Sequence, residues 1–362
     1  MDIPENASTA YEDYYYLDHF VITQSIPTQE PASDIEPIVQ ILTVIVYSVT
    51  CLLGLLGNGL VIAIITLRMK KSVNAIWFLN LAAADFLFNV FLPLNIAYTA
   101  MNYHWAFGRT MCKVNSLLLN LNMYTSVFLL TVISFDRCIS VVFPVWSQNH
   151  RNPKVAWLLC VLIWALGFSM SSPSLFFRDV RTDQDRIICF NNFSLSWSPS
   201  DNQLGEMRHT IVTVVRFLVG FIVPMTVITA CYGIMIFRLK RNRRTKIKKP
   251  LRIIIAIIMT FFLCWCPYHA LNLLETQHRS VSKDKVHALF SIAVPIVTSI
   301  AVSNSCMNPV LYVFMGQDFK KFKMTVLSRL ANALSEDTVH SSLPRRSFTK
   351  PSSMTEKETM LL

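Results

Sequence analysis

The sequence predicts an all-α membrane protein built as a seven-transmembrane helix bundle. Of its 362 residues, 53% are hydrophobic and only 15% are charged, and the mean hydropathy is +0.43. A soluble domain normally carries about 25% charged residues. Mostly apolar stretches of about 20 residues or more, long enough to cross a bilayer as a helix, lie at 38–67, 75–101, 111–142, 155–175, 209–237, 251–274 and 287–315.

The charges between these spans predict their orientation. Residues 1–37 contain no Lys or Arg and many Asp and Glu, whereas 240–252 are dominated by Lys and Arg. Short cytoplasmic loops collect Lys and Arg, so we expect the N-terminus outside the cell and the C-terminus inside. The basic residues lie beside span ends, which favours membrane topology over nucleic-acid binding as the reason for the net charge of +11.

We therefore predict four parts. An acidic extracellular arm covers 1–37, and its clustered tyrosines and carboxylates suit a basic protein partner or a simple tether. The helix bundle covers 38–315, and an amphipathic helix over 316–330 is expected to lie on the membrane lipid. A disordered cytoplasmic tail covers 331–362, and its candidate phosphorylation sites are Ser335, Thr338, Ser341, Ser342, Ser347, Thr349, Ser352 and Ser353.

Each span carries polar or helix-breaking residues that lipid alone tolerates poorly. A carboxylate in lipid costs several kcal/mol unless it is paired or hydrated, so Asp85 in the second span predicts a polar site inside the bundle. The side chains able to join it are Asn58 in the first span, Asn122 and Ser126 in the third, and Asn304 and Asn308 in the seventh. Prolines that remove a backbone hydrogen bond stand at Pro93, Pro173, Pro224, Pro267, Pro295 and Pro309.

Three further features lie toward the inner ends of the spans, and a fourth lies at a proline of the sixth span. Asp136 and Arg137 are neighbouring opposite charges where the third span reaches water, and Tyr232 lies toward the inner end of the fifth. Trp265 comes two residues before Pro267, and Tyr312 follows Pro309 by about one turn. Each feature also has a simpler explanation as snorkelling, packing or anchoring.

Seven of the nine cysteines lie well inside the apolar spans, and two do not. Cys112 stands at the outer start of the third span and Cys189 in the loop after the fourth. Both face the oxidising side, where a bridge would hold that loop over the bundle, and the alternative is two free thiols. Asn6 and Asn192 fit the N-glycosylation pattern on the same side.

Arg216 lies within the apolar run IVTVVRFLVG of the fifth span, too deep for a simple reach to the headgroups. It requires an anion, and a carboxylate suits it because two N–H donors bind two oxygens. The anion is either part of a ligand or Glu275, at the outer end of the sixth span.

Taken together and in this order, the motifs resemble the rhodopsin-like (class A) G-protein-coupled receptors over residues 38 to about 327. The resemblance rests on Gly57-Asn58, LAAAD ending at Asp85, Cys112, DRC at 136–138, Trp164, Pro224, CWCP at 264–267 and NPVLY at 308–312. Most members have Tyr where this chain has Cys138, but DRC is typical of the chemoattractant receptors within the family.

The resemblance implies roles for these residues. Arg137 would leave Asp136 on activation to meet the C-terminal helix of a G protein, with Tyr232 and Tyr312 supporting the open state. Phe261, Trp265 and the kinks at Pro267 and Pro309 would transmit ligand contact inward. The positions that match an allosteric sodium site of the inactive state are Asp85, Asn122, Ser126, Asn304 and Asn308; no other cofactor is implied. The resemblance also pairs Cys112 with Cys189.

The resemblance narrows to a chemoattractant receptor whose protein ligand inserts its C-terminal peptide into the outer end of the bundle. We therefore expect Arg216 or Arg178 to receive the peptide carboxylate, with Asn120, Tyr268 and Glu275 shaping the site. The family further implies an inhibitory-type heterotrimeric G protein, arrestin and receptor kinases as partners at the plasma membrane.

Other classes fit the sequence less well. Span seven contains no Lys for a retinal Schiff base, no internal repeat suggests a transporter, and no nucleophile or metal-ligand cluster suggests an enzyme. Two alternatives within the fold stay open: a receptor for a formyl peptide or lipid mediator, and a scavenger receptor that binds ligand without signalling.

Overall fold

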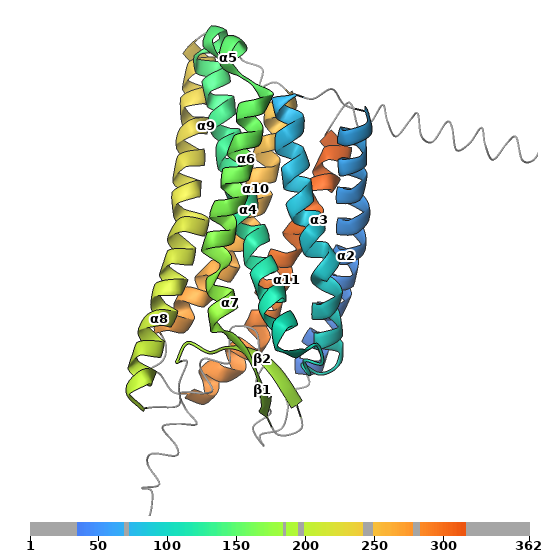
Figure 1. Cartoon of the computed structure of the whole chain (residues 1–362), viewed down its shortest axis with the longest axis vertical. Helices are drawn as coiled ribbons and strands as arrows, with labels where there is room; N and C mark the ends of the chain where they lie inside the picture. The colour runs from blue at the N-terminus through green and yellow to red at the C-terminus, as the bar shows by residue number, and fades with distance from the viewer. Residues whose placement is uncertain are drawn as a thin grey trace, which may run out of the picture. The chain divides into compact units, whose positions relative to one another are not determined.

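The computed structural model describes residues 35–68, 72–183, 186–194, 199–241, 249–277 and 283–315. Within them, seven helical segments are long and apolar enough to cross a membrane, as predicted (Figure 1). Residues 1–34 of the predicted arm over 1–37, the predicted helix over 316–330 and the tail lie outside the described residues.

The described elements follow one another along the chain in a fixed order. They are α2 (Ile35–Arg68), α3 (Val73–Ala100), α4 (Gly108–Val142), α5 (Pro144–His150), α6 (Pro153–Ser171), α7 (Pro173–Phe177), β1 (Arg178–Asp183), β2 (Arg186–Asn191), α8 (Pro199–Phe217), the π-helix η1 (Leu218–Ile222), α9 (Val223–Arg241), α10 (Lys249–Gln277) and α11 (Lys283–Met315). Most helices run a few residues beyond the predicted spans, because hydropathy marks only the most apolar part of each.

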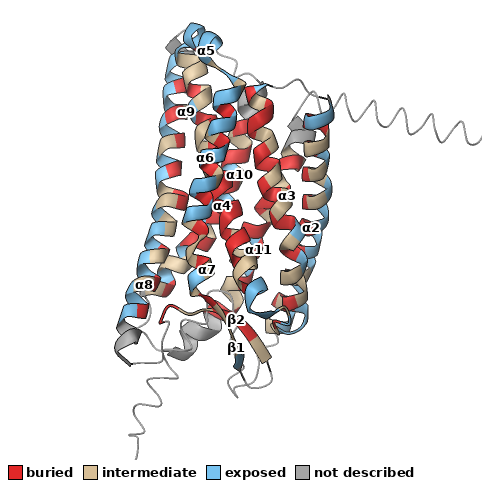
Figure 2. Cartoon of the chain, in the orientation of Figure 1, coloured by how far each residue is buried: buried red, intermediate tan, exposed pale blue. Residues whose placement is uncertain are grey.

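Burial in the bundle runs opposite to that of a soluble protein. Large apolar side chains such as Leu56, Val161 and Leu263 are exposed, while Asn58 and Asp85 are fully buried. Figure 2 shows buried residues concentrated on the inward faces of the helices. A bilayer accounts for this pattern, because lipid accepts apolar side chains and the interior holds the polar ones.

Helix α4 is central, contacting α3, α6, α9 and α10, while α2 packs against α3 and α11. Polar side chains tie these helices to one another. Asn58 Nδ2 donates to the Ser305 carbonyl at 2.9 Å, joining α2 to α11. Trp164 Nε1 donates to Asn80 Oδ1 at 3.0 Å, joining α6 to α3.

Gly57 lets α2 approach the proline kink of α11. A Cβ atom at this position would lie 2.7 Å from Pro309 Cγ, closer than packed carbon atoms allow. The glycine is therefore required by the close approach of two helices.

The π-helix η1 precedes Pro224, which was predicted only as a kink. Proline lacks an N–H group and its ring clashes with the carbonyl four residues earlier. Here Val223 donates to the Leu218 carbonyl five residues back, so the widened turn relieves the α-helical register ahead of the proline.

Candidate functional site

The hairpin end of the bundle, defined as the end that carries β1 and β2, is held by the predicted disulfide. Cys112 near the start of α4 is bonded to Cys189 on β2, which confirms the pairing. Cys189 pairs with Val180 across the antiparallel hairpin, and the Trp105 amide donates to the Ile187 carbonyl at 2.7 Å. The hairpin is thus fixed to α4 and to the segment before it.

Arg178, which was predicted to receive the carboxylate of a peptide ligand, also helps to attach the hairpin to α4. Its Nε donates to Ser116 Oγ at 2.9 Å and its Nη1 to the Cys189 carbonyl at 3.3 Å. Only 2% of the residue is exposed, and burial lowers the pKa of its guanidinium to about 10. It remains within electrostatic range of Tyr268 and Arg216, so it adds positive charge to the same region.

Arg216 lies at the end of α8, half-buried and directed into the bundle. Its guanidinium hydrogen bonds with Tyr124 and acts electrostatically on His269, which is buried. None of the ion pairs formed between described side chains joins Arg216 to Glu275, which is buried near the end of α10. Arg216 and Tyr268 both act electrostatically on Arg178, and a role for the three residues in binding a ligand stays a prediction.

Asn120, which was predicted to shape the ligand site, forms hydrogen bonds within α4 and to α7. Its Nδ2 donates to the Ser116 carbonyl at 3.0 Å and to Ser174 Oγ at 2.8 Å. It joins α4 to α7 beside Arg178, so it supports the arginine's hydrogen-bond partner Ser116 from the same turn of helix.

A column of aromatic rings leads from Arg216 toward the middle of the bundle. His269 lies 6.2 Å from Trp265 and Tyr268 lies 5.5 Å from it, while Phe261 lies 6.0 Å away on the other side, measured between ring centroids. All four are buried, as is Val127 on α4. Trp265 is thus in ring contact with His269, Tyr268 and Phe261.

The centre of the bundle holds the buried carboxylate. Asn122 Nδ2 donates to Asp85 Oδ1 at 2.8 Å and Asn308 Nδ2 donates to Asp85 Oδ2 at 2.7 Å. Ser126 and Asn304 are equally buried, and Ser126 Oγ and Asn304 Oδ1 have no hydrogen-bond partner within the described part of the chain.

These oxygens fit a small hard cation. Na⁺ takes carboxylate, hydroxyl and amide oxygens, the kinds of ligand that hard cations prefer. Among the described residues, no group of three or more His, Cys, Asp and Glu is placed to hold a metal, so any cation here has one carboxylate and neutral oxygens.

The α5 end, at the opposite end of the bundle, carries the Asp136–Arg137 pair. Arg137 Nη2 lies 3.2 Å from Asp136 Oδ2 and donates to Asn74 Oδ1 on α3. Tyr232 lies within electrostatic range of Arg137. The side chain of Tyr312 lies outside the described residues.

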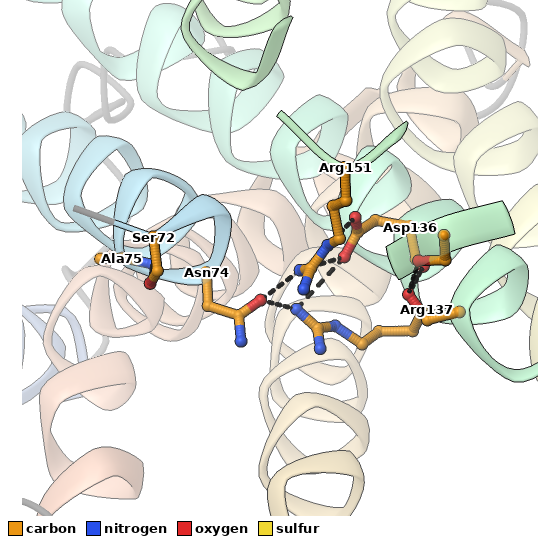
Figure 3. Close-up of polar contacts among 8 residues, drawn as sticks. Ser72, Asn74, Ala75, Asp136, Arg137 and Arg151 are labelled. Carbon is orange, nitrogen blue, oxygen red and sulfur yellow. Dashed lines mark hydrogen bonds and ion pairs between the residues drawn. The ribbon is translucent and has the colours of Figure 1, made fainter. Parts of the chain in front are cut away.

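Two residues of this cluster were missed by the sequence analysis. Arg151, in the segment after α5, binds both oxygens of Asp136, and Asn74 accepts from both arginines (Figure 3). The only sequence signal was a basic residue shortly before the Pro153 helix start, which any cytoplasmic loop also shows.

The structure gives little information on the predicted glycosylation and phosphorylation sites. Asn192 follows β2 directly, while Asn6 and the phosphorylation candidates in 331–362 lie outside the described residues. Glycosylation and phosphorylation therefore stay predictions.

Comparison with known proteins defines the class. The sequence pattern of the 7 transmembrane receptor (rhodopsin family) matches residues 57–312. The chain belongs to this family, whose members are receptors and not enzymes. With seven membrane-spanning helices, it is a multi-pass protein of the plasma membrane.

Within the family, the chain is 58% identical to the Chemerin-like receptor 1 of Sus scrofa over 100% of both chains. It is 56% identical to that of Homo sapiens over 94% of this chain and 91% of the relative. The C3a anaphylatoxin chemotactic receptor of Oncorhynchus mykiss is 40% identical over 84% and 82%. Stretches such as NYHWAFG and NALSEDT predicted a resemblance to the chemerin receptor, and these relatives confirm it.

Proposed function

We propose that this chain is a G-protein-coupled receptor for the chemoattractant protein chemerin, whose C-terminal peptide binds among Arg178, Arg216 and Tyr268. The observation that carries the ligand chemistry is that two arginines lie within electrostatic range of each other. An anion is stabilised where two positive charges act on the same region, and a terminal carboxylate supplies one. Relatives named Chemerin-like receptor 1 support the choice of protein ligand.

The proposed topology places the hairpin end outside the cell and the α5 end inside. The acidic arm over 1–37 then faces a basic protein ligand, and the disulfide lies on the oxidising side. The amphipathic helix over 316–330 lies on the inner lipid surface, and the basic segment over 240–252 meets cytoplasmic partners.

Signal transmission follows the contacts along the bundle. A peptide bound at Arg216 presses on Tyr268 and His269, and Trp265 and Phe261 pass the displacement to the kink at Pro267. The sodium site around Asp85 holds the inactive packing, and its rearrangement frees the inner halves of α10 and α11. Arg137 then leaves Asp136 to receive the C-terminal helix of an inhibitory-type G protein.

Phosphorylation of the tail would end the signal. Each phosphate adds negative charge to a Ser- and Thr-rich segment, which receptor kinases modify and arrestin then binds. Roles in leukocyte chemotaxis, inflammation and adipocyte signalling follow from the same resemblance.

Cells that express this chain test the proposal most directly. Chemerin and its C-terminal peptide are each expected to inhibit forskolin-stimulated cyclic AMP production, and pertussis toxin should remove the effect. Untransfected cells provide the control. Binding without any cyclic AMP response would favour a scavenger, although the intact Asp136–Arg137 pair argues for signalling. If the cells responded to formyl peptides or lipid mediators but not to chemerin, the ligand in this proposal would be one of those instead.

Sodium should weaken agonist binding, and Asp85→Asn should remove this effect. The substitution deletes the carboxylate charge that attracts the cation and turns an amide N–H group toward one of the two asparagine donors, so the cation loses its charged ligand. In the wild type we expect about fivefold lower peptide affinity in sodium than in N-methyl-D-glucamine, within the usual range of allosteric coupling. Equal sodium sensitivity in both proteins would contradict the assignment.

A further inference from the structure

Asp136 is shared by two arginines that hold it unequally. Arg151 Nε donates to Oδ1 at 2.8 Å and Arg151 Nη2 to Oδ2 at 2.7 Å. Arg137 reaches only Oδ2, at 3.2 Å. Two-point pairing of a guanidinium with a carboxylate is stronger and better oriented than one-point pairing, so Arg151 is the principal partner of Asp136.

Asn74 completes the cluster from α3. Its Oδ1 accepts hydrogen bonds from both Arg137 and Arg151, and Figure 3 shows the two guanidiniums converging on this oxygen. Ser72, whose Oγ accepts from the Ala75 amide at 3.2 Å, caps the start of α3 and fixes the turn that carries Asn74. One carboxylate and one amide oxygen therefore serve two cations.

The short helix α5 positions Arg151 for this role. Ser147 on α5 and Ser140 on α4 are hydrogen bonded at 3.0 Å, and the Arg151 amide donates to the Ser147 carbonyl at 3.1 Å. The Asp136 side chain is only 14% exposed and that of Arg151 only 27%, so water screens the cluster only in part.

We propose that Arg151 is the replacement counter-ion of Asp136: it keeps the carboxylate paired when Arg137 departs, and its charge favours that departure. A carboxylate left unpaired at a partly buried site is costly, and Arg151 removes this cost from the activated state. Arg151 is thus a positioning residue that acts through Asp136 and Arg137. The inference rests on the proposed signalling function.

Basal GDP release from an inhibitory-type heterotrimer, catalysed by the purified full-length receptor in nanodiscs, tests the proposal. Arg151→Ala leaves Arg137 as the sole partner of Asp136, so basal release should fall by about fivefold, within the range of coupled side chains. Arg151→Lys keeps the charge without two-point pairing and should lose less. Lys154→Ala, which removes an exposed cation from the neighbouring α6, is the matched control. It should catalyse GDP release at the wild-type rate.

A double-mutant cycle separates this role from a purely structural one. In an Asp136→Asn background no carboxylate needs a counter-ion, so adding Arg151→Ala should change basal release little. The same fall in both backgrounds, or unchanged or increased release in Arg151→Ala alone, would overturn the proposal. A wild-type receptor that catalysed no GDP release even with saturating peptide would overturn the proposed function and this inference with it. A wild-type receptor that catalyses release, together with unchanged basal release in Arg151→Ala, would overturn the inference alone.

Discussion

Arg216→Ala is expected to reduce the potency of the C-terminal peptide by about 100-fold, equal to about 2.8 kcal/mol of binding free energy. The guanidinium is half-buried, hydrogen bonds with Tyr124 and lies within electrostatic range of Arg178. A charge-assisted hydrogen bond in such a partly desolvated site is worth more than one at the surface. The measurement is the peptide concentration that gives half-maximal inhibition of cyclic AMP production, together with displacement of a labelled peptide.

The matched control is another arginine at the same end of the bundle. Arg109 pairs with Asp179 at 2.7 Å, but its side chain is 62% exposed, so Arg109→Ala should change potency by no more than about threefold. Arg216→Lys should keep part of the affinity, because an ammonium provides charge without two-point geometry.

Amidation of the peptide's C-terminus shows whether Arg216 meets the carboxylate. Amidation should weaken binding to the wild type and add little further loss to Arg216→Ala, because the two changes remove the same contact. Independent, additive losses would assign the carboxylate to another residue, Arg178 being the nearest candidate. Unchanged potency in Arg216→Ala would end the assignment altogether.

The fold was predictable because lipid imposes simple rules. A segment such as 75–101 is apolar over a length sufficient to cross a bilayer. In lipid it has to be helical, because only a helix satisfies the backbone hydrogen bonds within the segment. Predicted and observed bounds for this helix differ by one or two residues, since α3 covers Val73–Ala100. The hairpin β1–β2 was not predicted, because RDVRTD and RIICFN are short and lack a strong turn signal between them.

A side-chain partner was predictable only where a buried charge requires hydrogen-bond donors. A buried Asp85 requires donors, and Asn122 and Asn308 supply them, although Asn308 lies 223 residues away along the chain. Without the family resemblance, nothing in the spacing of these residues identifies the pair.

Residues with more than one plausible use were harder to place. Arg178 was predicted as a ligand reader, yet its hydrogen bonds attach the hairpin to α4. Arg151 was missed, because a basic residue in an inner loop already has a sufficient explanation in topology. Both roles depend on distances between elements, which a sequence pattern does not contain.

Arg137→Ala is expected to abolish agonist-stimulated GDP release while leaving a folded receptor that binds the peptide. Arg137 is held by one contact to Asp136 and one to Asn74, so its loss removes few native contacts. The proposed open state, in contrast, depends on this guanidinium to meet the G protein. GDP release should therefore fall to the uncatalysed rate even at saturating peptide.

Linkage between the two ends of the bundle makes this prediction stringent. If the peptide promotes G-protein binding, the G protein must raise peptide affinity by the same factor, because coupling free energy is reciprocal. Adding heterotrimer to the wild type should thus strengthen peptide binding by about tenfold, and adding it to Arg137→Ala should not. A heterotrimer-induced gain in affinity that survives in Arg137→Ala would mean that the inner contact is made elsewhere, and the release of Arg137 from Asp136 would then not be the switch.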